Sequence, residues 1–316
     1  GALTFSGFFH NRPVTPARNG ATMKIYGDYD QEALDAQYNL RPLVSNHQEI
    51  FDRYVRDGES TTDRYQVVAE IAYGSNPKQT LDLFPSTGSE GLAPVVCFIH
   101  GGYWRNKDKS DFHYLAPAFT HAGAHFVAIN YTLAPEASMD QIVQENREAL
   151  IWLANHAVAH GGDPERIHVV GHSAGGHLVA MLMATDWSLL PTGMAENDLI
   201  AGATAISGLF DLEPLRLSYL NDSLRLDKEQ AMRNSPIGLE PTTRSPLILA
   251  LGANETPEYH RQQAGLRDAW STYDLPLSVV EMPGLNHYDV IDHLGHPGSA
   301  LHHAVMDQVR LGGSRS

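Results

Sequence analysis

The stretch Gly171-His172-Ser173-Ala174-Gly175-Gly176 decides the fold, because it is a Gly-x-Ser-x-Gly sequence between two apolar runs. Residues 167–170 before it are predicted to form a strand, and residues 177–183 after it to form a helix. A serine on such a strand-to-helix turn sits on a strained elbow with its hydroxyl presented outward. The helix N-terminus also favours negative charge that develops there. The alternative is an ordinary glycine-rich turn, but this context predicts that Ser173 is a nucleophile.

A second motif, His100-Gly101-Gly102-Tyr103-Trp104, directly follows the apolar run 94–99. The simplest alternative is a glycine-bearing turn. His-Gly-Gly motifs after this strand supply the oxyanion hole of lipases and esterases. The backbone N–H groups of Gly102 and Tyr103, together with that of Ala174 from the elbow, are therefore predicted to hold an oxyanion. Two motifs at two strand ends arise by chance much less readily than either one.

Short apolar runs alternate with longer helical segments along most of the chain, which indicates a parallel sheet covered on both faces. The predicted fold class is α/β, with about eight mostly parallel strands, helices on both faces and a small helical cap. The predicted strands are 65–73, 80–84, 95–99, 126–131, 167–170, 203–206, 247–251 and 277–280. The predicted helices are 112–121, 139–160, 174–184, 257–273 and 299–311. The first two strands are expected to pair antiparallel.

We expect a single domain over residues 23–316, with residues 1–22 as a tail and Met23 as a native start. The polar helical segments 28–57 and 211–236 are expected to be cap material, because insertions of this kind cover the carboxyl ends of the strands. No stretch has the pattern of a signal peptide or a membrane span. The sequence therefore predicts a cytoplasmic protein.

The 316 residues include 22 Lys+Arg and 37 Asp+Glu, for a formal net charge of −15. This balance argues against nucleic acid or an anionic membrane as the main partner. The basic cluster between Arg105 and Lys109 is interrupted by an aspartate and is expected to be a solvated loop. The single cysteine, Cys97, lies in an apolar run and is expected to be buried. No cofactor and no metal are expected; the partner is a small-molecule substrate, and a homo-oligomer is left open.

The base and the acid must follow the serine along the chain. Since the chain has 17 histidines, position must decide. His287 lies just past the last predicted strand, in a loop that would return over the elbow. His172 and His177, which flank the serine, are interpreted as packing or surface residues. Glu255, at the end of the strand 247–251, is the preferred acid.

With these residues placed, the chain resembles the arylformamidase (kynurenine formamidase) branch of the α/β-hydrolase fold, from about residue 38 to about residue 292. Members of that branch usually carry Asp where this chain has Glu255, so Asp211 and Glu258 are the alternative acids. The motifs that carry the resemblance are His100–Trp104, Asn130-Tyr-Thr-Leu-Ala-Pro135, residues 171–177, Ser207-Gly-Leu-Phe-Asp-Leu-Glu-Pro214, Glu255-Thr-Pro-Glu-Tyr-His-Arg-Gln262 and the His287 loop.

The expected chemistry is attack by Ser173 on a carbonyl, with His287 as base, followed by hydrolysis of an acyl-enzyme. The resemblance implies an aryl-formamide substrate such as N-formylkynurenine. Trp104 and Phe210 are expected to contact its aromatic part, with ordinary packing as the alternative. Two other functions stay open: a carboxylesterase of broad range for short-chain esters, and a non-catalytic ligand receptor. A receptor would be expected to have lost the serine or the histidine.

Overall fold

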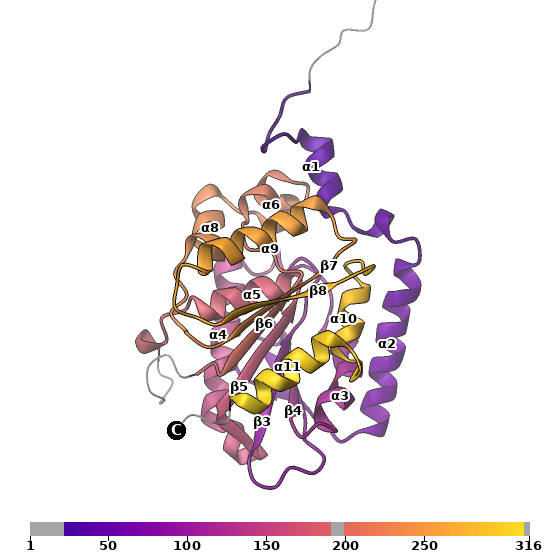
Figure 1. Cartoon of the computed structure of the whole chain (residues 1–316), viewed down its shortest axis with the longest axis vertical. Coiled ribbons are helices and arrows are strands. Elements are labelled where there is room, and N and C mark those ends of the chain that lie inside the picture. Colours follow the sequence, from indigo (N-terminus) through magenta and orange to yellow (C-terminus); the bar gives the residue numbers. More distant parts are fainter. Residues whose placement is uncertain (1–21, 191–198, 313–316) are drawn as a thin grey trace, which may run out of the picture.

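An eight-stranded sheet runs through the centre of the described part of the chain (Figure 1). The computed structural model describes residues 22–190 and 199–312, so nearly all of the predicted tail lies outside the described residues. The strand order is β1-β2-β4-β3-β5-β6-β7-β8. The strands are β1 (Val68–Ala72), β2 (Thr80–Phe84), β3 (Ala93–Ile99), β4 (His125–Ile129), β5 (Gly162–His172), β6 (Gly202–Ile206), β7 (Leu247–Gly252) and β8 (Leu277–Met282). The predicted number of strands is confirmed.

The pairing of the strands is also as expected. β1 and β2 pair antiparallel, β2 and β4 pair antiparallel, and all the other neighbours are parallel. Parallel neighbours need crossover connections, and helices on the two faces of the sheet provide them. The sequence therefore correctly predicted an α/β fold with an antiparallel entry.

Helices cover both faces of the sheet (Figure 1). Helices α4, α5 and α9 pack on one face, and α3, α10 and α11 on the other, with α2 packed against the 3₁₀ helix η2. The helices are α1 (Gln31–Tyr38), α2 (His47–Arg64), α3 (Ala116–Thr120), α4 (Met139–His156), α5 (Ala174–Met183), α6 (Glu213–Leu217), α7 (Asn221–Leu224), α8 (Lys228–Arg233), α9 (Pro257–Trp270), α10 (Asp289–Leu294) and α11 (Ala300–Leu311). Short 3₁₀ helices are η1 (Arg41–Leu43), η2 (Lys109–Leu115), η3 (Ala157–His160), η4 (Trp187–Leu189) and η5 (Pro236–Gly238).

Strand β3 explains why the predicted strands are continuous apolar runs and do not alternate. Its side chains point to opposite faces in turn, and both faces are buried. Cys97 and Ile99 pack in the core beneath α4 and α5, whereas Val96 and Phe98 pack in the core beneath α3 and α11. Each fully buried side chain of this size contributes about 1.5–3 kcal/mol. Cys97 is buried, as expected.

Strand register places the chemically important loops side by side. Ile99 of β3 pairs with Gly171 of β5, and His172 pairs with Ile206 of β6. Ile206 in turn pairs with Ala250 of β7. The carboxyl ends of parallel strands meet at one edge of the sheet, so the residues that follow these strands gather there.

Three differences from the expected secondary structure stand out. The predicted helix 112–121 is η2 followed by α3, which has a proline in its first turn. Proline lacks an N–H group and therefore starts a new helix readily. The predicted helix 139–160 is α-helical only to His156 and continues as η3. Helix α10, directly after the His287 loop, was not predicted.

The sequence predicted that the basic cluster between Arg105 and Lys109 is a solvated loop. The structure shows that this prediction is wrong. The side chain of Lys109 is only 3% exposed, and its ammonium group pairs with Glu70 and lies 3.3 Å from Asp82. Asp82, on the buried strand β2, also accepts a hydrogen bond from His113 (2.8 Å). A buried carboxylate needs such partners. This requirement draws Lys109 inward.

The predicted cap segments lie beside the carboxyl ends of the parallel strands. Segment 28–57 contains α1 and most of α2, and segment 211–236 contains α6, α7 and α8. Helix α1 contacts both α6 and α9, and Figure 1 shows α1, α6 and α8 gathered at one end of the molecule. Among the described residues, no helix has the length and apolar character to cross a bilayer.

Candidate active site

Ser173 sits on a tight turn between β5 and α5. Its backbone has φ 59° and ψ −117°, which is strained for a residue with a side chain. The Ser173 N–H donates to the Ile206 carbonyl of the neighbouring strand at 2.8 Å, which holds the turn in place. A Cβ at Gly175 would overlap the Ile99 carbonyl oxygen, and one at Gly171 would overlap the Gly175 backbone. The two glycines are therefore required by close approach, as the elbow motif predicts.

His287 is held by Glu255. Its Nδ1 lies 2.7 Å from Glu255 Oε2, and both side chains are buried. A carboxylate can only accept, so the proton lies on Nδ1 and Nε2 is the nitrogen free to accept another. The other oxygen, Oε1, accepts from the Gly252 N–H at 3.0 Å and from the Ser207 hydroxyl. The carboxylate is thus fully partnered. Ser207 belongs to a quoted motif, but sequence reasoning gave it no role.

The two alternative acids lie elsewhere. Asp211 and Glu258 share Arg261, whose guanidinium is 3.0 Å from the first and 2.9 Å from the second. Glu258 also accepts a hydrogen bond from Tyr38 at 2.7 Å. Of the three carboxylates considered from the sequence, the structure brings Glu255 to His287.

His172 holds the His287 loop through a hydrogen bond to its backbone. Its Nε2 donates to the His287 carbonyl at 2.9 Å, and the two ring centroids are 4.7 Å apart. Burial, together with the nearby His287, keeps the pKa of His172 well below its ordinary value. A neutral imidazole suits this position, because it donates one hydrogen bond without adding charge. From the sequence, His172 was interpreted as a packing or surface residue, and nothing in the sequence indicated this partner.

The loop after β3 runs against the elbow. A Cβ at Gly101 would come 2.9 Å from Ser173 Cβ and 2.7 Å from the His172 carbonyl oxygen. Gly102 and Tyr103 both have positive φ, 102° and 50°. In the described part of the chain, the N–H groups of Gly102, Tyr103 and Ala174 donate to no other backbone group. The sequence predicted these three groups as the donors of an oxyanion hole, and that role stays a prediction.

A tyrosine pair completes the surroundings of the serine. The hydroxyls of Tyr103 and Tyr259 are 2.8 Å apart, and Tyr103 donates to the Tyr38 carbonyl at 2.7 Å. The Tyr259 ring packs on His287 with centroids 4.6 Å apart. Burial raises the pKa of Tyr259, and hydrogen bonds with Tyr103 and Ser173 oppose part of that rise. Tyr259 is therefore a neutral phenol that contacts both Ser173 and His287.

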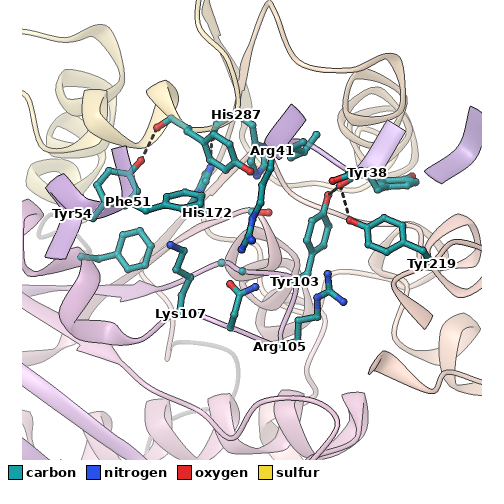
Figure 2. Close-up of a pocket in the computed structure, with 18 residues that line it drawn as sticks. Tyr38, Arg41, Phe51, Tyr54, Tyr103, Arg105, Lys107, His172, Tyr219 and His287 are labelled. Atoms are coloured by element: carbon teal, nitrogen blue, oxygen red, sulfur yellow. Dashed lines mark hydrogen bonds between the residues drawn. The ribbon is translucent and has the colours of Figure 1, made fainter. Parts of the chain in front are cut away.

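A pocket of about 410 Å³ opens onto Ser173 and His287 (Figure 2). Its wall is rich in aromatic and cationic side chains. The lining residues are Tyr38, Asn39, Leu40, Arg41, Phe51, Tyr54, Gly101, Gly102, Tyr103, Arg105, Asn106, Lys107, Phe112, His172, Ser173, Tyr219, His287 and Tyr288. Within residues 22–190 and 199–312, no group of three or more His, Cys, Asp or Glu side chains is placed to hold a metal ion.

Trp104 and Phe210, expected to contact the substrate, are not among the lining residues. Both are buried in the core. The Trp104 indole donates to His177 Nδ1 at 3.2 Å, and His177 Nε2 donates to the Asn234 carbonyl at 2.8 Å. Phe210 lies against the backbone of Gly208. Trp104 has a positive φ of 56°, and its ring meets the His177 ring with centroids 5.0 Å apart.

Comparison with known proteins agrees with the fold described above. The BD-FAE family matches residues 81–201. The kynurenine formamidase of Danio rerio is 30% identical, and the match covers 86% of this chain and 94% of that protein. Two solved structures share the fold: a candidate thioesterase from Silicibacter sp. (TM-score 0.75, 27% identity, 88% of this chain and 98% of the other) and the carboxylesterase EstE1 from a metagenomic library (TM-score 0.64, 17% identity, 84% and 97%).

The sheet order and the matched structures define the α/β-hydrolase fold. The match to a formamidase identifies the chain as a hydrolase of the ester or amide type. Within that class, the branch is decided by the sequence identity to the Danio rerio protein and by the share of both chains that this match covers. The chain belongs to the kynurenine formamidase family.

We expect the buried His177 to make the protein less stable in acid. Burial lowers its pKa to about 4, from about 6.5 in an unfolded chain. The unfolded state therefore binds more protons between these values, so stability is lost as the pH falls through this window. Protonation of His177 in the unfolded state lowers the free energy of unfolding by roughly 3 kcal/mol by pH 4. Denaturant unfolding of wild type and His177→Gln at pH 7, 5.5 and 4 measures it.

The glutamine amide in this variant would keep an acceptor for Trp104 and a donor for Asn234 without titrating. The free energy of unfolding of the wild type should therefore fall more steeply with acid than that of the variant. His260→Gln, at an exposed position, is the matched control and should follow wild type. Parallel pH profiles for wild type and His177→Gln would contradict the assignment.

Proposed function

We propose that this protein hydrolyses a small-acyl amide or ester through an acyl-enzyme on Ser173. The favoured substrate is an aryl-formamide such as N-formylkynurenine. The single observation that carries the proposal is the His287–Glu255 hydrogen bond of 2.7 Å at the edge of the pocket that Ser173 also lines. It leaves His287 Nε2 as the only nitrogen of that ring able to take the serine proton.

Each step uses a group already described. His287 Nε2 takes the Ser173 proton as Oγ attacks the carbonyl carbon, and the N–H groups of Gly102, Tyr103 and Ala174 hold the oxygen that becomes negative. The imidazolium then gives its proton to the leaving nitrogen or oxygen, and the bond to the acyl carbon breaks. Water attacks the acyl-serine by the same route and releases the acid. Glu255 stabilises the imidazolium in both halves.

The glutamate in the place of the usual aspartate fits this role. Its longer side chain is held at one oxygen by Ser207 and by the Gly252 N–H, while the other oxygen meets His287. Fixing a carboxylate from two sides leaves it little freedom to turn away from the imidazole. Ser207 is therefore a positioning residue in this proposal.

The substrate preference rests on size. Tyr103 and Tyr259 meet beside Ser173, which supports a small acyl group there. Phe51, Tyr54 and Tyr219 provide an aromatic wall for a larger leaving group. A broad carboxylesterase with the same triad is the second candidate, which the likeness to an esterase fold supports.

We also propose that segments 28–57 and 211–236 act as the cap. Arg41, Phe51 and Tyr54 from the first segment, and Tyr219 from the second, line the pocket. The cap would therefore supply most of the contacts to the leaving group. A cytoplasmic location and the lack of a nucleic-acid partner stay predictions from the sequence.

Ser173→Ala should remove nearly all hydrolysis, because no other group can form the acyl-enzyme. Loss of such a nucleophile typically lowers kcat by a factor on the order of 10⁶. Steady-state rates on p-nitrophenyl acetate measure the effect, with circular dichroism to show that the fold persists. Ser188→Ala, at an exposed serine outside the pocket lining, should keep wild-type activity. An active Ser173→Ala protein would disprove the mechanism.

Glu255→Gln should lower kcat far more than Glu258→Gln does. The amide would present an N–H group or a neutral oxygen to His287 and disturb its tautomer, and loss of a triad carboxylate can reach about 10⁴ in kcat. Both glutamates are buried, so the pair also controls for general damage to the interior. Rates should be compared at equal folded fraction, checked by thermal unfolding. A larger loss in Glu258→Gln would mean that Glu255 is not the acid.

At a fixed aryl leaving group, kcat/KM should fall steeply from formyl and acetyl to butyryl and longer acyl chains. An acyl chain that meets the tyrosines beside Ser173 clashes, and a clash of one or two methylenes costs about 1–3 kcal/mol. A series of p-nitrophenyl esters, measured beside N-formylkynurenine, tests this. Preference for acyl chains of about six carbons or more, without formamidase activity, would favour the broad esterase.

A further inference from the structure

The loop after β3 is strained over a short stretch of backbone. Gly102, Tyr103, Trp104 and Lys107 all have a positive φ, between 50° and 102°. For a residue with a side chain this conformation is unfavourable, and it persists only where the surrounding structure holds it. Gly102 and Tyr103 also carry two of the proposed oxyanion donors. The proposed reaction therefore depends on the contacts that hold this loop in place.

Two side chains anchor the loop to the rest of the protein. The Trp104 indole donates to His177 in the core at 3.2 Å. The Tyr103 hydroxyl donates to the Tyr38 carbonyl at 2.7 Å. Tyr38 is the last residue of α1, and a helix leaves its final carbonyls without partners inside the helix. The Tyr103 hydroxyl therefore satisfies this helix end and ties the loop to α1 at the same time.

A third tyrosine ties the same loop to the proposed base. Tyr259 is buried in the first turn of α9, shortly after Glu255 along the chain. Its hydroxyl lies 2.8 Å from that of Tyr103, and its ring packs on the His287 ring with centroids 4.6 Å apart. One side chain thus contacts both the oxyanion loop and the imidazole. The relative position of these two parts of the site passes through Tyr259.

We infer that Tyr259 is a positioning residue, whose hydroxyl acts through Tyr103 to hold the oxyanion loop in a fixed position relative to His287. The inference rests on the proposed function, because it concerns the donors proposed there. Those donors bind the carbonyl oxygen most strongly as it becomes negative, so a loop that shifts loses more transition-state binding than substrate binding. A misplacement of about 1 Å can cost on the order of 100-fold in rate.

Tyr259→Phe should lower kcat/KM on p-nitrophenyl acetate by roughly 10- to 100-fold. The variant keeps the ring against His287 and removes only the hydroxyl. Tyr73→Phe is the matched control, because it removes another buried hydroxyl, which donates to the Asn130 carbonyl at 2.6 Å and lies outside the pocket lining. This control should keep wild-type kinetics. Thermal unfolding gives the folded fraction of each variant.

Inhibition by 2,2,2-trifluoroacetophenone reports on the loop directly. The Ser173 oxygen bonds to the carbonyl carbon, the carbonyl oxygen takes the π electron pair and becomes negative, and the serine proton passes to His287. The Ki should rise in Tyr259→Phe by about the factor by which kcat/KM falls, because the adduct and the transition state need the same donors. Acetophenone has a similar shape without the activating fluorines, and its Ki should not change.

Tyr103→Phe removes the other hydroxyl of the pair and keeps the backbone N–H of that residue. It should lower kcat/KM at least as much as Tyr259→Phe does. The double variant should match Tyr103→Phe within about twofold, because both changes break the same hydrogen bond and their effects cannot add independently.

Wild-type kcat/KM in Tyr259→Phe would overturn the inference, and so would an equal rise in Ki for both ketones, which indicates general damage to the pocket. Losses that multiply in the double variant would also overturn it. Wild-type activity in Tyr103→Phe alone would mean that Tyr259 acts through its hydrogen bond with Ser173 and not through the loop. Failure of the proposed function is distinct, because the wild type itself would then bind the trifluoroketone no more tightly than acetophenone.

Discussion

The close approach of two backbone segments is the constraint on which the rest of the site depends. Gly175 at the start of α5 packs against the end of β3, and Gly101 just beyond that strand packs against Ser173. No side chain fits at either contact. The approach fixes Ser173 on its strained turn and brings the loop that carries Gly102 and Tyr103 to the same place. The proposed nucleophile and the proposed oxyanion donors are thus positioned by one piece of backbone packing.

Local sequence patterns predicted the parts of the site that depend on local backbone geometry. The elbow, the glycine loop and the strand ends were predictable because glycine spacing and apolar runs encode them directly. The choice of Glu255 over Glu258 could be made because one follows a strand and the other lies inside a helix turn. The structure then places Glu255, and neither alternative, beside His287.

The residues that the sequence did not reveal act through long-range contacts. His172 reaches the His287 carbonyl, and Ser207 reaches Glu255, across 115 and 48 positions of the chain. Lys107 lay in a cluster that was expected to be solvated, and only tertiary packing places it on Phe51. For Trp104 and Phe210, the sequence suggested contact with the substrate, but the structure buries both side chains in the core. Aromatic residues beside a motif can face the core. Composition and spacing do not determine such partners.

The central claim is that Ser173, activated by His287, is the group that forms the acyl-enzyme. Treatment of the native protein with a fluorophosphonate, followed by peptide mass spectrometry, tests it most directly, because such reagents phosphonylate an activated serine. We expect one adduct per chain, on the peptide that contains Ser173, forming in step with the loss of hydrolysis. An adduct on another serine that tracks the loss of activity, or full inactivation with Ser173 unmodified, would contradict the account.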